Sequence, residues 1–263
     1  MVVSTKCTIF AVDLQINIKN VFIMSDFQYN RDYRAMEYGG AVGSAVAENT
    51  LIKNVYWWMC GALVITGLTS YYVANNFSLM EMILGNKMVF FGLIIAEFAL
   101  VIGLTAAINK ISALTATLMF LLYSVINGAT LSSIFLIYQI QSIGTTFFVT
   151  AGTFGVMALY GATTKRDLTK LGSILVMALI GIILATLVNM FLKNGMMDTI
   201  ISVIGVIIFV GLTAYDSQKI KAMLAGAEVN DTTQKFAVLG ALTLYLDFVN
   251  LFLYLLRFMG NRK

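Results

Sequence analysis

The chain has 263 residues, of which 59% are hydrophobic and 11% charged, and its mean hydropathy is +0.87. Soluble domains carry about 25% charged residues, so this composition indicates an integral membrane protein. The net charge of +4 is modest and is typical of membrane topology, which argues against a nucleic-acid partner. The sequence contains no histidine, so imidazole metal sites and Ser-His or Cys-His catalysis are excluded, and we expect neither an enzyme nor a bound cofactor.

Residues 1–50 are polar and mixed, and we expect them to form a flexible cytoplasmic tail. The apolar patch within them, TIFAVDLQI, is interrupted by Asp13 and is too short to span a membrane. Met24 precedes SDFQYNRDYR, which is typical of a natural N-terminus. Residues 1–23 are therefore either an upstream extension or a start-site artefact.

Residues 51–263 are predicted to form one transmembrane domain, because apolar runs of about 20 residues recur through them. The seven expected spans cover 54–74, 87–108, 112–138, 144–163, 171–192, 199–220 and 236–258. The connections are short, and the longest are 75–86 and 221–235. They leave no room for a separate soluble domain.

The Lys and Arg residues near the span ends predict the orientation. A cytoplasmic N-terminus places ten of them on the inner side and five on the outer side, which favours this arrangement. Seven spans put Arg257, Arg262 and Lys263 outside, against the positive-inside rule. A six-span arrangement with a re-entrant last segment would place them inside. We favour seven spans, because 236–258 is long enough to cross.

Three carboxylates lie inside apolar spans. Asp247 and Glu97 are expected near the middle of the membrane, and Asp216 nearer the cytoplasmic end of its span. An ionised carboxylate in hydrocarbon costs at least ~2.5–3.5 kcal/mol, so such residues usually have a function. Alternatively, Glu97 is a structural hydrogen-bonding acid, and Asp216 is an interfacial residue paired with Lys219 or Lys221.

The intramembrane amides have a simpler interpretation. Asn127, Asn189 and Asn250 are most simply helix-packing residues that hydrogen-bond between helices.

If Asp216 and Asp247 face each other, ionising both carboxyl groups at once is unfavourable in free energy, and they would share one proton. Such a pair can sense pH or exchange its proton for a cation, and carboxylate oxygens suit Ca²⁺. Two or three carboxylates fall short of a closed cage, so transient binding along a pathway is expected rather than storage. On ideal straight helices the depths of the two aspartates do not match perfectly.

Several stretches of the sequence, in this order and spacing, resemble the Bax inhibitor family, also called the transmembrane Bax inhibitor motif family. They are YSVINGATLSSI (Tyr123–Ile134), TKRDLTKLG (Thr164–Gly172), AYDSQKIK (Ala214–Lys221) and LYLDFVNLFLYLLRFMG (Leu244–Gly260). The resemblance covers roughly residues 50–260 and looks most like a bacterial inner-membrane member.

The resemblance implies an all-α integral membrane fold in which six transmembrane helices surround a central seventh. It also implies a pH-sensitive calcium leak controlled by two aspartates, which match Asp216 and Asp247, and an acidic position in the second helix, which matches Glu97. Bacterial members can carry a basic residue that latches the aspartates shut. The matching position here is Ile108, so Lys110 is only a candidate substitute.

The leading hypothesis is therefore a proton-gated Ca²⁺ leak channel in which Asp216 and Asp247 bind Ca²⁺ transiently and Glu97 belongs to the ion pathway. A second hypothesis, also taken from the family, is a modulator or substrate-like partner of a membrane-bound AAA protease, for which residues 24–50 offer a handle. A stress or cell-death-suppressor-like regulator without channel activity is a further alternative. A retinal-type receptor is disfavoured, because the seventh span contains no lysine for a Schiff base.

Overall fold

The computed structural model describes residues 45–263, and all of its regular secondary structure in that range is helical. The long helices are α2 (Ala45–Asn75), α4 (Lys87–Ala107), α5 (Ala113–Leu131), α7 (Ile140–Thr163), α8 (Thr169–Leu192), α9 (Gly195–Leu224) and α10 (Asp231–Met259). The short pieces are α3 (Phe77–Met80), the π-helical turn η1 (Glu81–Gly85) and α6 (Ile134–Ile137), which prolongs α5.

Seven segments in the described range are long and apolar enough to cross a membrane, as predicted. Two boundaries differ from the prediction. Helix α2 begins at Ala45, inside the segment assigned to the tail, and the remainder of that tail lies outside the described residues. The predicted loop 221–235 is largely helical, because α9 continues to Leu224 and α10 begins at Asp231.

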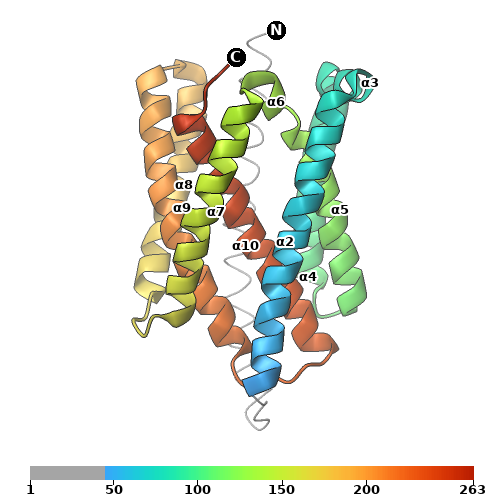
Figure 1. The fold of residues 1–263 in the computed structure, drawn as a ribbon, viewed down its shortest axis with the longest axis vertical. Helices are drawn as coiled ribbons and strands as arrows, with labels where there is room; N and C mark the ends of the chain where they lie inside the picture. The colour runs from blue at the N-terminus through green and yellow to red at the C-terminus, as the bar shows by residue number, and fades with distance from the viewer. Residues whose placement is uncertain (1–44) are drawn as a thin grey trace.

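Helix α10 is the centre of the bundle, which confirms the predicted arrangement of six helices around a seventh. Every residue from Phe236 to Leu256 is buried. The helix crosses the bundle obliquely (Figure 1) and packs chiefly against α2, α5, α7 and α9. Helix α4 packs on the outside of α5, and α8 packs on the outside of α9. Any polar group between Phe236 and Leu256 of α10 is therefore surrounded by protein.

Polar side chains cap the starts of α3, α4, α5, α9 and α10 in a chain without proline. Asn76, Asn86, Ser112 and Asn194 each accept a hydrogen bond from a backbone N–H in the first turn that follows. Asn230 forms a capping box with Thr233 at the start of α10. These caps satisfy backbone donors that the helices leave unpaired.

Glycines set the register between α9 and α10. A Cβ atom at Gly205 of α9 would collide with the ring of Tyr254 on α10, so the two helices meet closely there. Nearer the other end, Gly240 of α10 lies against Ile220 of α9. These two contacts hold the antiparallel helices in one alignment, and Asp216 and Asp247 fall between them.

The two ends of the bundle hold different segments of the chain. The end that holds the start of α2 and the turn between α9 and α10 is the predicted cytoplasmic end. The opposite end holds a strap, which we define as residues 260–263. The backbone N–H of Lys263 donates to the Ile137 carbonyl at 2.8 Å, and the Asn261 carbonyl accepts from the N–H of Gln139 at 3.0 Å. Asp198, at the start of α9, pairs with Arg257 and Arg262.

Candidate functional site

The two predicted aspartates meet in the middle of the protein. Asp216 comes from α9 and Asp247 from α10, and their relative exposures are 1% and 0%. Their carboxyl groups lie within hydrogen-bonding reach of each other. The expected mismatch in depth does not occur, because the glycine contacts described above align this part of α9 with the middle of α10. The site that we call the aspartate pair thus links the central helix to one neighbour.

Two basic residues, Lys219 and Lys221, follow Asp216 on α9. The ammonium group of Lys219 lies 5.6 Å from the centre of the Tyr215 ring and acts electrostatically on Asp216. Lys221 donates from Nζ to the Ala162 carbonyl at 2.7 Å. Because Asp216 is almost fully buried, the expectation that it is hydrated from the cytoplasm is wrong, whereas its electrostatic interaction with Lys219 is retained.

Glu97 belongs to a separate buried cluster on the other flank of α10. Its Oε1 atom accepts from the hydroxyl of Thr130 at 2.5 Å, and its Oε2 atom accepts from Nδ2 of Asn127 at 3.1 Å. Asn127 in turn accepts at Oδ1 from the hydroxyl of Tyr245 at 3.0 Å. The Tyr245 oxygen lies 2.7 Å from Oγ1 of Thr66. We call these five side chains the Glu97 cluster; it joins α2, α4, α5 and α10.

The structure does not bring all predicted site residues together. Glu97 is directed at α5, and the charged groups that act on the aspartate pair are the two aspartates and Lys219. Lys110 is exposed in the turn between α4 and α5, while Ile108 is buried there. The latch role of Lys110 stays a prediction that this conformation does not support.

The intramembrane amides behave differently from one another. Asn127 hydrogen-bonds between helices, as predicted. Asn250 donates to the Leu246 carbonyl of its own helix, and Asn189 accepts from the backbone N–H of Asn194 just beyond the end of α8. These two contacts therefore stabilise local segments of chain.

Sequence reasoning missed the hydroxyl residues that connect Glu97 to the central helix. Tyr245 stands two positions before Asp247 in the LYLDF stretch, and Thr66 and Thr130 lie in other spans. A tyrosine in the middle of an apolar span is a recognisable signal, because a buried hydroxyl needs a partner. The identity of that partner depends on helix rotation, which the sequence does not indicate.

The two sites have different chemical capacities. A hydrogen bond between two carboxyl groups requires a proton on one of them, so the aspartate pair can hold one proton and one negative charge. Within residues 45–263, no three His, Cys, Asp or Glu side chains are grouped closely enough to hold a metal ion. Ca²⁺ takes six to eight oxygen ligands, so two carboxylates can contact the ion only in passing.

Comparison with known proteins places this chain in a family. The model of the family "Inhibitor of apoptosis-promoting Bax1" matches residues 48–263. The Inner membrane protein YbhL of Escherichia coli K12 is 53% identical over 216 residues, which cover 81% of this chain and 92% of that protein. An uncharacterised protein of Borreliella burgdorferi is 48% identical over 219 residues, 82% of this chain and 94% of that one. Protein RP147 of Rickettsia prowazekii is 41% identical over 212 residues, with coverages of 80% and 89%.

Proposed function

The chain belongs to the Bax inhibitor family, and from this premise we propose that it is a slow, pH-sensitive calcium leak channel controlled by the aspartate pair. The proposal includes a bacterial inner membrane as its location, as the name of the Escherichia coli relative suggests. The observation that carries it is the buried contact between Asp216 of α9 and Asp247 of the central helix.

The proposed control is electrostatic. With one shared proton, the two carboxyl groups can stay in contact, and the packing of α9 against α10 is undisturbed. Loss of that proton leaves two like charges about 4 Å apart, which repel by about 4 kcal/mol at an effective dielectric constant of ~20. This energy is enough to change the balance between two packings of α10 by about three powers of ten.

In the proposed mechanism, Ca²⁺ competes with the shared proton for the aspartate pair. A divalent cation between two ionised carboxylates removes their repulsion, so binding of Ca²⁺ and loss of the proton favour each other. Few protein ligands are available, and the ion therefore keeps most of its water and leaves quickly. Slow leakage follows, because each passage requires an opening of the packed core.

The test uses the purified full-length chain in vesicles that contain a calcium indicator, with flux measured across a series of pH values. Wild-type protein should leak Ca²⁺ in a pH-dependent manner, and Asp216→Asn and Asp247→Asn should each change that dependence, because asparagine cannot ionise. The double variant should lose this pH dependence. Asp167→Asn is the matched control, since Asp167 is exposed in the turn before α8.

Two results would refute the proposal. Wild-type pH dependence retained in both single variants and in the double variant would show that the pair is not the gate. Absence of Ca²⁺ flux at every pH would show that the protein is not a calcium channel. In that case the alternative is a modulator of a membrane-bound AAA protease, which co-purification of such a protease would detect.

A further inference from the structure

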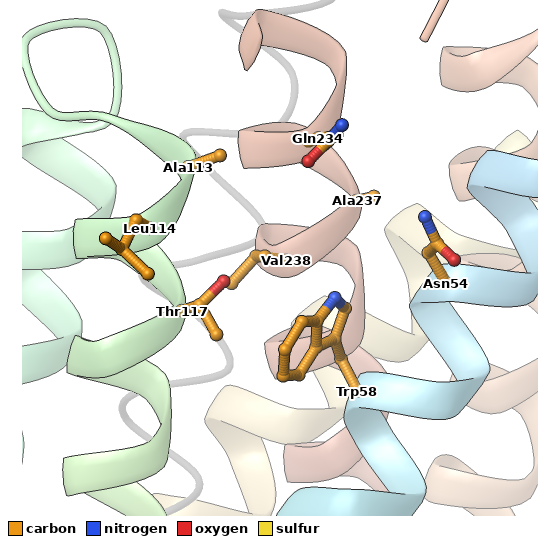
Figure 2. Close-up of a pocket in the computed structure, with 8 residues that line it drawn as sticks. All are labelled: Asn54, Trp58, Ala113, Leu114, Thr117, Gln234, Ala237 and Val238. Carbon is orange, nitrogen blue, oxygen red and sulfur yellow. The ribbon is translucent and has the colours of Figure 1, made fainter. Parts of the chain in front are cut away.

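Helices α2, α5 and α10 line a partly open cavity of about 220 Å³ at the predicted cytoplasmic end, apart from the aspartate pair. Its lining includes three neutral polar side chains, Asn54 of α2, Thr117 of α5 and Gln234 of α10, together with Trp58 (Figure 2). Gln234 is exposed, so the cavity reaches the surface of the bundle. It is large enough for several water molecules and offers them polar partners.

The Glu97 cluster lies deeper along the same three helices. Tyr245 is seven residues beyond Val238 on α10, and Ser124, whose carbonyl accepts from Thr66, is seven beyond Thr117 on α5. A step of seven residues is nearly two turns, so these positions share a face about 10 Å apart. On α2, Thr66 likewise lies eight residues beyond Trp58. The cavity and the Thr66–Tyr245 end of the cluster therefore lie along one seam between α2, α5 and α10, and Asn127 connects that end to Glu97 of α4.

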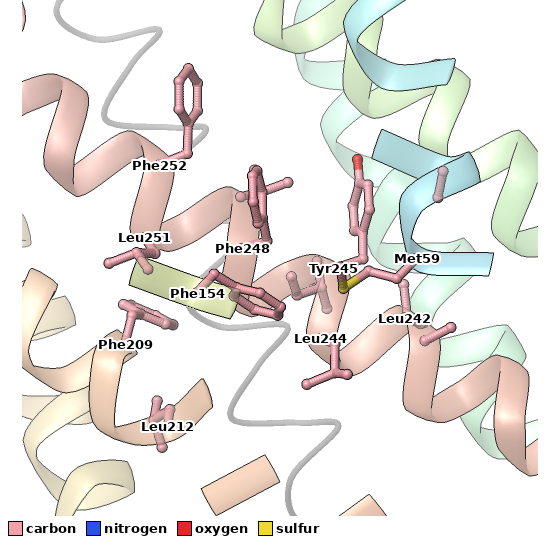
Figure 3. Close-up of a cluster of buried hydrophobic side chains, with 14 of the residues drawn as sticks. Met59, Phe154, Phe209, Leu212, Leu242, Leu244, Tyr245, Phe248, Leu251 and Phe252 are labelled. Atoms are coloured by element: carbon pink, nitrogen blue, oxygen red, sulfur yellow. The ribbon is translucent and has the colours of Figure 1, made fainter. Parts of the chain in front are cut away.

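Buried apolar side chains occupy the helix turns between the cavity and the cluster. Between the two polar levels, α2 and α10 contribute the small side chains of Ala62 and Ala241, and α10 adds Leu242. Helix α5 contributes the ring of Phe120, which is fully buried and meets the Tyr245 ring edge-on, with 5.6 Å between the ring centres. Tyr245 points to the α2 and α5 side of α10, away from Phe209 and Leu212 of α9 (Figure 3). The Phe120 ring thus lies directly against the Tyr245 ring of the cluster.

The hydrogen bonds of the cluster permit two protonation states of Glu97. Asn127 and Thr130 both donate to the carboxyl group of Glu97. The hydroxyl of Thr130 also has a second acceptor, the Ile126 carbonyl at 3.0 Å. When a proton from water binds Glu97, Thr130 can turn to that carbonyl and accept from the new carboxylic acid. The titratable groups that face Glu97 are Tyr123 of α5 and Tyr245 of α10, and α2 presents the neutral Thr66.

We propose that the seam is a proton access path from the predicted cytoplasmic end to Glu97, with the Phe120 ring as its gate. Glu97 is then a second proton-binding site, on the flank of α10 opposite the aspartate pair. A hydronium ion in the cavity gives up a proton when the Phe120 ring swings aside. One O–H bond of the hydronium breaks and leaves water, and one O–H bond forms on the Glu97 carboxylate. The path serves protons and does not depend on calcium flux.

Infrared spectroscopy of the reconstituted full-length protein tests this proposal. Difference spectra between acidic and alkaline samples should contain a carboxylic acid band that disappears in Glu97→Gln. The band should persist in the double variant Asp216→Asn/Asp247→Asn, so failure of the calcium gate would leave this result intact. Absence of any band sensitive to Glu97→Gln would overturn the proposal.

The gate is tested by the rate at which that band shifts after transfer into D₂O. Phe120→Ala should accelerate the exchange by at least about tenfold, which is ~1.4 kcal/mol in the opening step. Phe154→Ala is the matched control, because Phe154 of α7 is equally buried and packs edge-on against Phe248 at 5.4 Å, outside the seam. Exchange unchanged in Phe120→Ala, or accelerated equally in Phe154→Ala, would refute the gate. If Phe120→Ala does not fold, Phe120→Leu replaces it, with the same two outcomes.

Discussion

Removing one hydroxyl from the central helix offers a sharp test of the Glu97 cluster. Tyr245→Phe keeps the ring and its edge-on contacts with Phe120 and Tyr123, at 5.6 and 5.8 Å between ring centres. It removes the donor to Oδ1 of Asn127 and the contact with Oγ1 of Thr66. Any loss of stability therefore reports hydrogen bonding and not packing.

The two lost contacts are unequal. Thr66 retains an acceptor for its hydroxyl, because Oγ1 also donates to the Ser124 carbonyl at 2.9 Å. Asn127 is fully buried, and Tyr245 is the donor that the described residues supply to its Oδ1 atom. Leaving one buried acceptor unpaired costs about 1–3 kcal/mol in water-soluble proteins, and membrane measurements lie lower, so we expect about 1–2 kcal/mol here.

The matched variant is Thr66→Val, which is close to the same shape. It leaves the bond from Tyr245 to Asn127 intact, so we expect it to cost less than about 1 kcal/mol. Tyr72→Phe, at an exposed position of α2, controls for the chemical change itself. The free energy of unfolding in mixed detergent micelles measures all three. A larger loss in Thr66→Val than in Tyr245→Phe, or no loss in Tyr245→Phe, would show that the cluster is wrongly described.

Two further predictions concern packing and capping. Gly205→Ala should destabilise the protein by about 1–3 kcal/mol, because the new methyl group meets the Tyr254 ring. Gly152→Ala on α7 has open space around the new methyl group and should be neutral. Thermal unfolding compares the two variants, and equal stability would contradict the close approach of α9 and α10. Asn230→Ala should lower the stability of the protein by about 1 kcal/mol, because it removes the capping box with Thr233. Hydrogen exchange in the first turn of α10 should become faster, and unchanged exchange there would contradict the cap.

The sequence predicts the spans well and the contacts between them poorly. Apolar runs locate all seven crossing segments, because length and hydropathy determine what can span a membrane. The start of α10 at Asp231 was missed, although Asn230 followed by Thr233 is a readable capping signal.

The candidate site could be predicted only in part. Asp216 and Asp247 are conspicuous because charged groups in spans are rare, but their meeting depends on how closely Gly205 approaches Tyr254. Glu97 was conspicuous for the same reason, and its partners were not. These spans are apolar on every face, so periodicity gives little indication of which side of a helix turns inward.

The strap at the far end of the bundle restricts how the central helix can move. Asp198 and the backbone of 137–139 hold the last turn of α10 and the residues after it. At the other end, Asp231 accepts from the backbone N–H of Ala113, and Glu48 accepts from that of Gly226 in the preceding turn. These contacts at both ends oppose sliding of α10 along its axis. Movement is then easier in its middle, the segment that carries Tyr245 and Asp247 on its opposite flanks, so we expect a displacement at one acid site to shift the other.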